Sequence, residues 1–167
     1  MTFLFYFCFM AGKFTITEKI DETLKDFKAL LPRYREVKGN AKLFQLFMSR
    51  NRNPLWDLSG NKIFKTGLKS RLFLESNTKG VEDHFIQRTK SMKIVFHKLD
   101  ENPDMSVEQF TNLITAYSST ITLTKEEHGK VTSFAKNNDM LNYQAYNLLG
   151  IEVVGLSEFM IERNILF

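Results

Sequence analysis

The sequence contains a single cysteine, Cys8, which excludes an intramolecular disulfide and zinc sites built on paired cysteines. Its apolar segment 1–10 (MTFLFYFCFM) is far shorter than the roughly 20 residues that a membrane-spanning helix needs. The segment also lacks the basic start and the small-residue cleavage site of a secretory signal. We therefore expect a protein of a reducing, cytoplasmic compartment with no membrane partner. Residues 1–9 would form a first strand, a peripheral apolar arm, or an extension ahead of a start at Met10.

The composition is that of a folded chain. Hydrophobic residues make up 43% of the 167 residues and include sixteen phenylalanines, which is enough for the core of a single domain. A disordered chain would instead combine low hydrophobicity with a high net charge. The sequence also has no internal repeats and no low-complexity tracts.

Apolar spacing and capping signals predict a mostly helical α+β protein. The expected helices cover 18–31 (ended by Pro32), a short stretch after Asn40, 91–99, a stretch from 106, 125–135 and 142–149. The expected strands or extended pieces are 62–65, 70–74 and 119–123, with 151–154 as a strand or a docked tail. The chain then divides into an N-terminal helical region (1–50), a basic irregular or β segment (51–81), a central unit (82–137) and a C-terminal helix and tail (138–167).

Positive charge is concentrated in one part of the chain. Segment 50–93 has a net charge of +6, whereas the chain from 94 onward has a net charge of −5. A basic segment interleaved with aromatic residues fits a polyphosphate partner, although the same charges also fit an ordinary solvated surface. The predicted nucleic-acid contacts are Arg50, Arg52, Lys62, Lys65, Lys69, Arg71, Lys79 and Lys90.

Two short motifs carry the chemistry. Asp83 and His84 stand side by side at the end of a predicted extended piece, and His128 lies one turn into a helix that Thr124 caps. A one-metal hydrolytic site needs a carboxylate and an imidazole on the ion, together with a second imidazole that deprotonates water. Taken singly, His128 also fits a hydrogen-bonded core residue and His84 an ordinary loop histidine.

Together the motifs resemble the HNH, or His-Me finger, endonucleases, especially the phage-type members. The phrase DHFIQR (83–88) is similar to their first strand, and TITLTKEEHGKV (120–131) to their second strand and metal-binding helix. The resemblance implies a ββα-metal unit, DNA as substrate, and Mg²⁺ or Mn²⁺ as cofactor. It implies His84 as the general base, with Asp83 and His128 as metal ligands. Arg88 would contact the phosphate through its bidentate donors.

The chain departs from the family pattern at two places. No asparagine occupies the middle position near Ser119, so Ser119 or Thr120 would orient the general-base loop through a hydroxyl, or a backbone group would do so. His128 also follows Asp83 by 45 positions, which requires a helical insertion, 91–116. Two other functions stay open: a DNA-binding protein with a degenerate nuclease fold, and a protein-interaction module anchored by its Phe-rich start.

Overall fold

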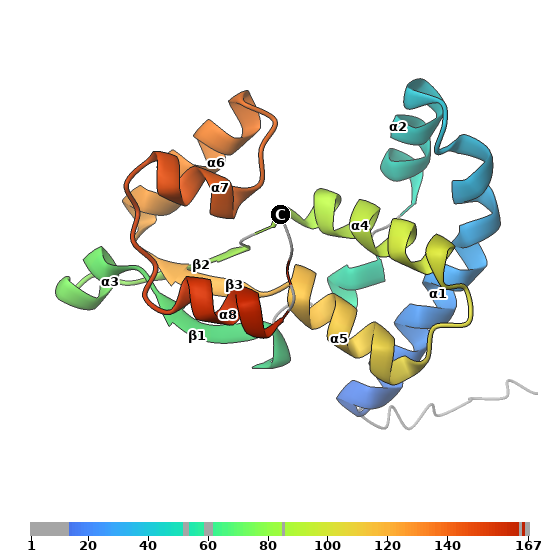
Figure 1. Ribbon diagram of the computed structural model, residues 1–167, viewed down its shortest axis with the longest axis horizontal. Helices are drawn as coiled ribbons and strands as arrows, with labels where there is room; N and C mark the ends of the chain where they lie inside the picture. The colour runs from blue at the N-terminus through green and yellow to red at the C-terminus, as the bar shows by residue number, and fades with distance from the viewer. Residues whose placement is uncertain (1–13, 52–53, 59–61, 85, 164, 166–167) are drawn as a thin grey trace, which may run out of the picture.

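The computed structural model describes residues 14–51, 54–58, 62–84, 86–163 and 165. It has two lobes (Figure 1): a helical lobe of α1, α2, α4 and α5, and a second lobe in which a small sheet packs with α6, α7 and α8. The predicted class, a mostly helical α+β fold, is confirmed at this level. The expectation for residues 1–9 concerns a segment outside the described residues. Among the described residues, no helix combines the length and the apolar character that crossing a membrane requires.

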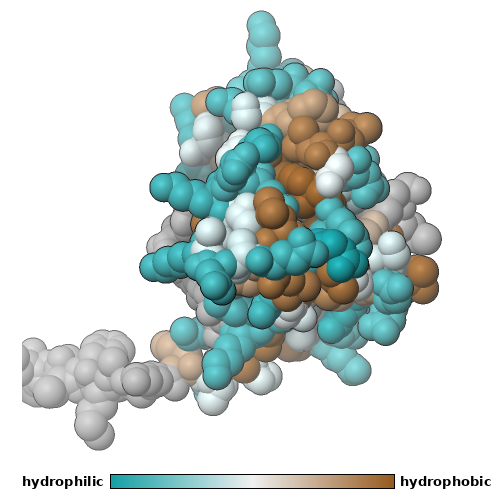
Figure 2. Space-filling view, turned by 90° about the vertical axis from the view of Figure 1, so that its left-hand side faces the viewer, coloured by the Kyte–Doolittle hydropathy of each residue, from teal (hydrophilic) through white to brown (hydrophobic). Residues whose placement is uncertain are grey.

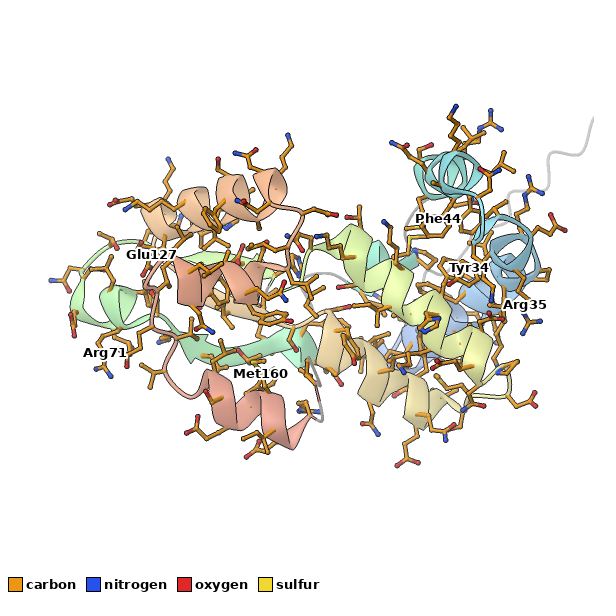
Figure 3. All side chains as sticks on the ribbon, turned by 45° about the horizontal axis from the view of Figure 1, so that its top comes forward. Tyr34, Arg35, Phe44, Arg71, Glu127 and Met160 are labelled. Carbon is orange, nitrogen blue, oxygen red and sulfur yellow. The ribbon has the colours of Figure 1, made fainter. Side chains whose placement is uncertain are left out.

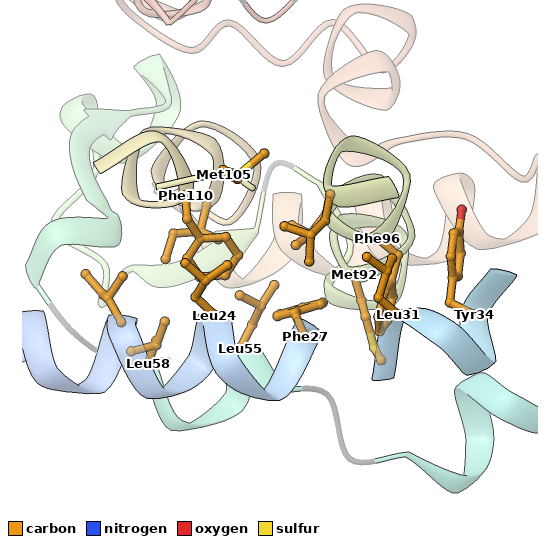
Figure 4. Packing of buried hydrophobic residues seen from close by; sticks show 14 of the residues in the cluster. Leu24, Phe27, Leu31, Tyr34, Leu55, Leu58, Met92, Phe96, Met105 and Phe110 are labelled. Atoms are coloured by element: carbon orange, nitrogen blue, oxygen red, sulfur yellow. The ribbon is translucent and has the colours of Figure 1, made fainter. Parts of the chain in front are cut away.

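The helical lobe is built on α1. Its helices are α1 (Ile16–Val37), α2 (Ala41–Arg50), α4 (Arg88–Glu101) and α5 (Val107–Tyr117), with 3₁₀ turns η1 (Pro54–Leu58) and η2 (Lys62–Phe64). Side chains from α1, α4, α5 and η1 meet in one core (Figure 4). The segment between Asp83 and His128 that was expected to be helical contains the helices α4 and α5, which share their core with the N-terminal helices.

The prediction that Pro32 ends the first helix is wrong, because α1 continues through Pro32 to Val37. Tyr34 and Val37 extend the buried face of the helix, and the Tyr34 ring stacks on Phe96 with centroids 5.0 Å apart. The Phe44 ring of α2 makes an edge contact with Tyr34, with ring centroids 6.0 Å apart (Figure 3). Burial of this extra turn offsets the hydrogen bond that a proline cannot donate.

The second lobe contains a three-stranded sheet with the order β1-β3-β2. Strand β1 (Lys65–Lys69) runs parallel to β3 (Thr120–Leu123), and β2 (Val81–His84) runs antiparallel to β3. The other elements of this lobe are α3 (Arg71–Glu75), α6 (Lys125–Asn137), α7 (Asn142–Leu148) and α8 (Leu156–Glu162). Ile121 and Leu123 of β3 are 1% and 0% exposed and belong to the core that α6 and α7 share.

Two extended pieces of the sequence fold differently from the prediction. Residues 62–64 form the 3₁₀ turn η2, and the stretch expected to be extended at 70–74 becomes helix α3. Ser70 causes this turn, since its Oγ accepts a hydrogen bond from the Phe73 backbone N–H at 3.2 Å and caps the helix. Val153 docks on Ser70 through an isolated bridge, and α8 follows where no helix was predicted.

At Gly80 the backbone lies close to side chains of β3 and α3. A Cβ atom at this position would lie 2.4 Å from Thr122 Cγ2 and 2.7 Å from Phe73 Cε2. We expect Gly80→Ala to lower the free energy of unfolding by about 1–3 kcal/mol, because α3 must shift away from the sheet. Gly129→Ala is the matched control: Gly129 lies in α6 with open space around it and should gain about 0.5–1 kcal/mol. Urea unfolding of both variants measures the difference, and equal values would contradict the packing described here.

Candidate metal and nuclease site

The site forms where β2 meets α6. Antiparallel pairing places Asp83 opposite Ile121 and His84 opposite Thr120, and β3 then leads directly into α6 at the Thr124 cap. Side chains alternate along a strand, so Asp83 shares the buried face of β2 that lies under α6. Asp83 and His128 are thereby brought together from opposite ends of the 45-residue gap.

A buried carboxylate fixes the first turn of α6. The Glu127 side chain accepts hydrogen bonds from Ser70 Oγ at 2.6 Å and from the Thr124 backbone N–H at 2.9 Å. Thr124 Oγ1 accepts in return from the Glu127 N–H, which completes the predicted capping box. Figure 3 shows Glu127 at the start of α6, near the point where β1 ends. This network ties α6 to the end of β1 and so holds His128 in place over β2.

The central contact is between Asp83 and His128. Nδ1 of His128 lies 2.8 Å from Oδ1 of Asp83. The Asp83 side chain is 2% exposed, whereas that of His128 is 36% exposed. The Asp83 side chain is therefore enclosed by the protein, whereas a ligand can reach the His128 side chain from solvent.

Helix α7 supplies the remaining partners of Asp83. The Tyr146 hydroxyl donates to Oδ2 at 2.5 Å. Nδ2 of Asn142 lies 3.3 Å from each carboxylate oxygen and donates to the His84 carbonyl at 2.8 Å. The sequence analysis missed both residues, although Asn142 and Tyr146 stand four positions apart and so share one face of the predicted last helix.

The environment opposes charge on Asp83. Burial raises the pKa of the carboxyl above its ordinary value of 3.8, although hydrogen bonds from Tyr146, His128 and Asn142 act in the other direction. Burial and the neighbouring carboxylate raise the pKa of Tyr146 well above 10.0. The Tyr146 phenol is therefore protonated at neutral pH and acts as a donor. A positive charge beside Oδ1 would stabilise the ionised form of Asp83.

Asp83 and His128 could together hold a divalent cation as two protein ligands. The 2.8 Å separation of Oδ1 and Nδ1 is that of a hydrogen bond, and it is also close to the roughly 2.9 Å that separates adjacent ligand atoms of an octahedral ion with bonds of 2.0–2.1 Å. A carboxylate with an imidazole suits several divalent ions. Within the described part of the chain, no group of three or more His, Cys, Asp or Glu side chains could hold an ion. Water and a phosphate oxygen would complete the coordination.

His84 occupies a different position from Asp83. Strand alternation directs its side chain to the opposite face of the sheet, the face on which Glu82 accepts from Thr120 Oγ1 at 2.7 Å. Its backbone carbonyl is held from the Asp83 side by Asn142. The side chains of Asp83 and His84 thus lie on opposite faces of the sheet at the end of β2. Asn142 of α7 fixes the backbone between them.

The predicted orienting residues have other partners. Ser119 Oγ donates to the Thr115 carbonyl, and Thr120 Oγ1 donates to Glu82 and to the Phe64 carbonyl. Both hydroxyls thus bond other groups, while the Thr120 backbone pairs with His84 in the sheet, and the orienting role of Ser119 and Thr120 stays a prediction. Asn142 donates to the His84 carbonyl because α7 packs back against β2, a contact that sequence spacing does not reveal.

The predicted phosphate contacts are only partly available. Arg71 makes a two-pronged contact with Glu152 at 2.6 Å, and Lys90 bonds Asp139 and the Met140 carbonyl. Lys65 shares the His84 face of the sheet through its contact with Glu82 at 3.6 Å. Arg50, Lys62, Lys69 and Lys79 are exposed, Arg52 lies outside the described residues, and Arg88 begins α4 with a side chain outside the description. The contact with Glu82 thus places Lys65 beside β2.

Searches for related proteins leave the family open. No family model, no curated protein and no solved structure matches this chain.

Proposed function

We propose that this protein is a divalent-metal-dependent DNA endonuclease of the HNH type. In this proposal β2, β3 and α6 form the ββα-metal unit, and α4 with α5 is its helical insertion. The observation that carries the proposal is the 2.8 Å approach of the Asp83 carboxylate to the His128 imidazole. An antiparallel strand pair followed by a capped helix makes this contact, in the order in which the motifs occur in the sequence.

The chain's own residues have distinct tasks in this reaction. Asp83 and His128 hold the cation, and Asn142 fixes the backbone of the Asp83–His84 pair. A bound divalent ion would supply positive charge to the scissile phosphate and to the departing 3′ oxygen. His84 takes the proton of the attacking water. Arg88, which belongs to the same motif, is the proposed phosphate contact, because a guanidinium offers two parallel donors to phosphate oxygens.

The proposed DNA surface is the end of the sheet at which β2 finishes, where Asp83 and His84 lie on opposite faces, and it extends along the face of His84. Lys65 and Lys69 are exposed on the edge strand β1 and pair with Thr120 and Thr122, the residues of β3 that lie opposite His84 and Glu82. We therefore place both lysines on the face shared by Glu82 and His84. Arg71 and Lys90 are committed to protein partners and contribute less. Binding through such lysines releases counterions, so DNA affinity should fall steeply as salt is added.

The test is cleavage of supercoiled plasmid by purified protein with Mg²⁺ or Mn²⁺. Open-circular or linear product should form, and His84→Ala should reduce the rate by about 10²–10⁴-fold, because general base catalysis is lost. His97→Ala is the matched control: His97 is an exposed histidine of α4 that pairs with Glu101 at 3.3 Å. Equal rates for the wild type and the His84 variant would contradict the assignment of the base.

A protein-interaction module is the second candidate, and apolar surface favours it. The end of the molecule that carries α3 exposes apolar surface between polar side chains (Figure 2). Leu72 and Leu74 of α3 are 49% and 53% exposed. Absence of both cleavage and salt-sensitive DNA binding would favour this function. DNA binding without cleavage would favour a DNA-binding protein whose nuclease site is degenerate.

A further inference from the structure

Tyr146 contacts the half of Asp83 that faces away from His128. Its hydroxyl is 2.5 Å from Oδ2, and the whole residue is 0% exposed. A phenol at neutral pH can donate its hydrogen to a carboxylate, and such charge-assisted bonds are the stronger ones. Oδ2 is therefore capped from inside the protein by a donor that no solvent molecule replaces.

The other carboxylate oxygen of Asp83, Oδ1, faces a partner that is exposed to solvent. It lies 2.8 Å from Nδ1 of His128, the one partner of Asp83 whose side chain is substantially exposed. Asn142 bridges both oxygens evenly, at 3.3 Å, and so does not distinguish them. The asymmetry of the carboxylate comes from Tyr146 on one oxygen and His128 on the other.

We propose that Tyr146 is a positioning residue that holds Asp83 as a monodentate ligand through Oδ1 and thereby sets the affinity for the divalent cation. This inference rests on the proposed function. Without the hydroxyl, the carboxylate is free to turn about its terminal bond, and Oδ2 loses its donor. Removing a group that orients a metal ligand typically weakens metal binding by about 10–100-fold.

Mn²⁺ binding to Tyr146→Phe tests the proposal, with the free ion followed by electron paramagnetic resonance. We expect the dissociation constant to rise by about 10-fold or more relative to the wild type. Tyr143→Phe is the matched control, since it removes a phenol hydroxyl from the same helix that takes no part in the hydrogen bonds of Asp83 given above. Thermal melts in EDTA report stability separately. A merely structural role would lower the melting temperature and leave the dissociation constant of the folded protein unchanged.

A second measurement does not depend on a Tyr146 variant. Infrared spectra of wild-type protein labelled with ¹³C-carboxyl aspartate, with Asp83→Asn subtracted, isolate the two carboxylate stretches of Asp83. On addition of Mn²⁺ we expect their separation to widen, as for monodentate coordination, and a narrowed separation would overturn the proposal. Mn²⁺ binding that is equal in the wild type and Tyr146→Phe would overturn this inference alone. Absence of saturable Mn²⁺ binding to the wild type would overturn the proposed metal site together with it.

Discussion

Asp83→Asn is expected to abolish divalent-ion binding and plasmid cleavage. Replacing residues that only orient a metal ligand costs up to about 100-fold in affinity, so loss of a ligand charge should cost at least that much. The fold should survive, because an asparagine oxygen can still accept from Tyr146. Calorimetric titration with Mn²⁺ at neutral pH measures the affinity. Retention of wild-type affinity would remove Asp83 from the site.

The same variant should change how stability depends on pH. Folding raises the Asp83 pKa above 3.8, so the folded chain holds this proton more tightly than the unfolded chain does. Between 3.8 and the raised value, this carboxyl therefore makes the wild type less stable as the pH rises. Asparagine does not titrate, so Asp83→Asn should lack this loss of stability with rising pH. Thermal melts in EDTA across that pH range measure how the stability of each protein changes with pH. The same pH dependence in both proteins would contradict a buried Asp83 with a raised pKa.

Asn142→Ala is expected to reduce cleavage by about 10–100-fold, since it removes the amide that orients the ligand-bearing backbone. It should also lower the free energy of unfolding by about 1–3 kcal/mol, because buried acceptors on Asp83 and His84 lose a donor. Single-turnover cleavage rates are compared at a temperature at which the variant is folded. They report the effect on cleavage separately from the effect on stability.

Two controls define that result. Asn147→Ala changes an exposed residue of the same helix and should leave both rate and stability near the wild type. Ser119→Ala removes a hydroxyl that bonds the Thr115 carbonyl, so its effect on cleavage should be small. A large cleavage defect in Ser119→Ala beside a small one in Asn142→Ala would favour the orienting role predicted from the sequence.

Local signals in the sequence were enough for many of the elements. Helices predicted from about 18, 106 and 125 begin in the structure at Ile16, Val107 and Lys125, each with a capping box, and β3 lies within the predicted strand 119–123. The predicted helix end at Pro32 was wrong because tertiary packing extends the helix beyond it. The extended stretch predicted at 70–74 was wrong because the Ser70 side chain caps a helix there.

The candidate site, too, could be predicted only in part from the sequence. Asp83 and His128 could be paired from sequence because the motifs imply a strand that lies beneath a helix start. Asn142 and Tyr146 could not, since their contact with Asp83 depends on how α7 folds back over β2, which residue spacing does not encode. The availability of the lysines and arginines likewise depended on acidic partners distant in sequence, as with Arg71 and Glu152.

The most direct measurement of the central claim is anomalous scattering from crystals soaked in Mn²⁺. The account predicts a manganese peak between Asp83 Oδ1 and His128 Nδ1, on the side from which the His128 ring is open to solvent. A peak that is absent from this position while manganese occupies other sites, with the 2.8 Å hydrogen bond of Asp83 and His128 intact, would contradict it. The pair would then be a structural hydrogen bond that holds α6 on the sheet.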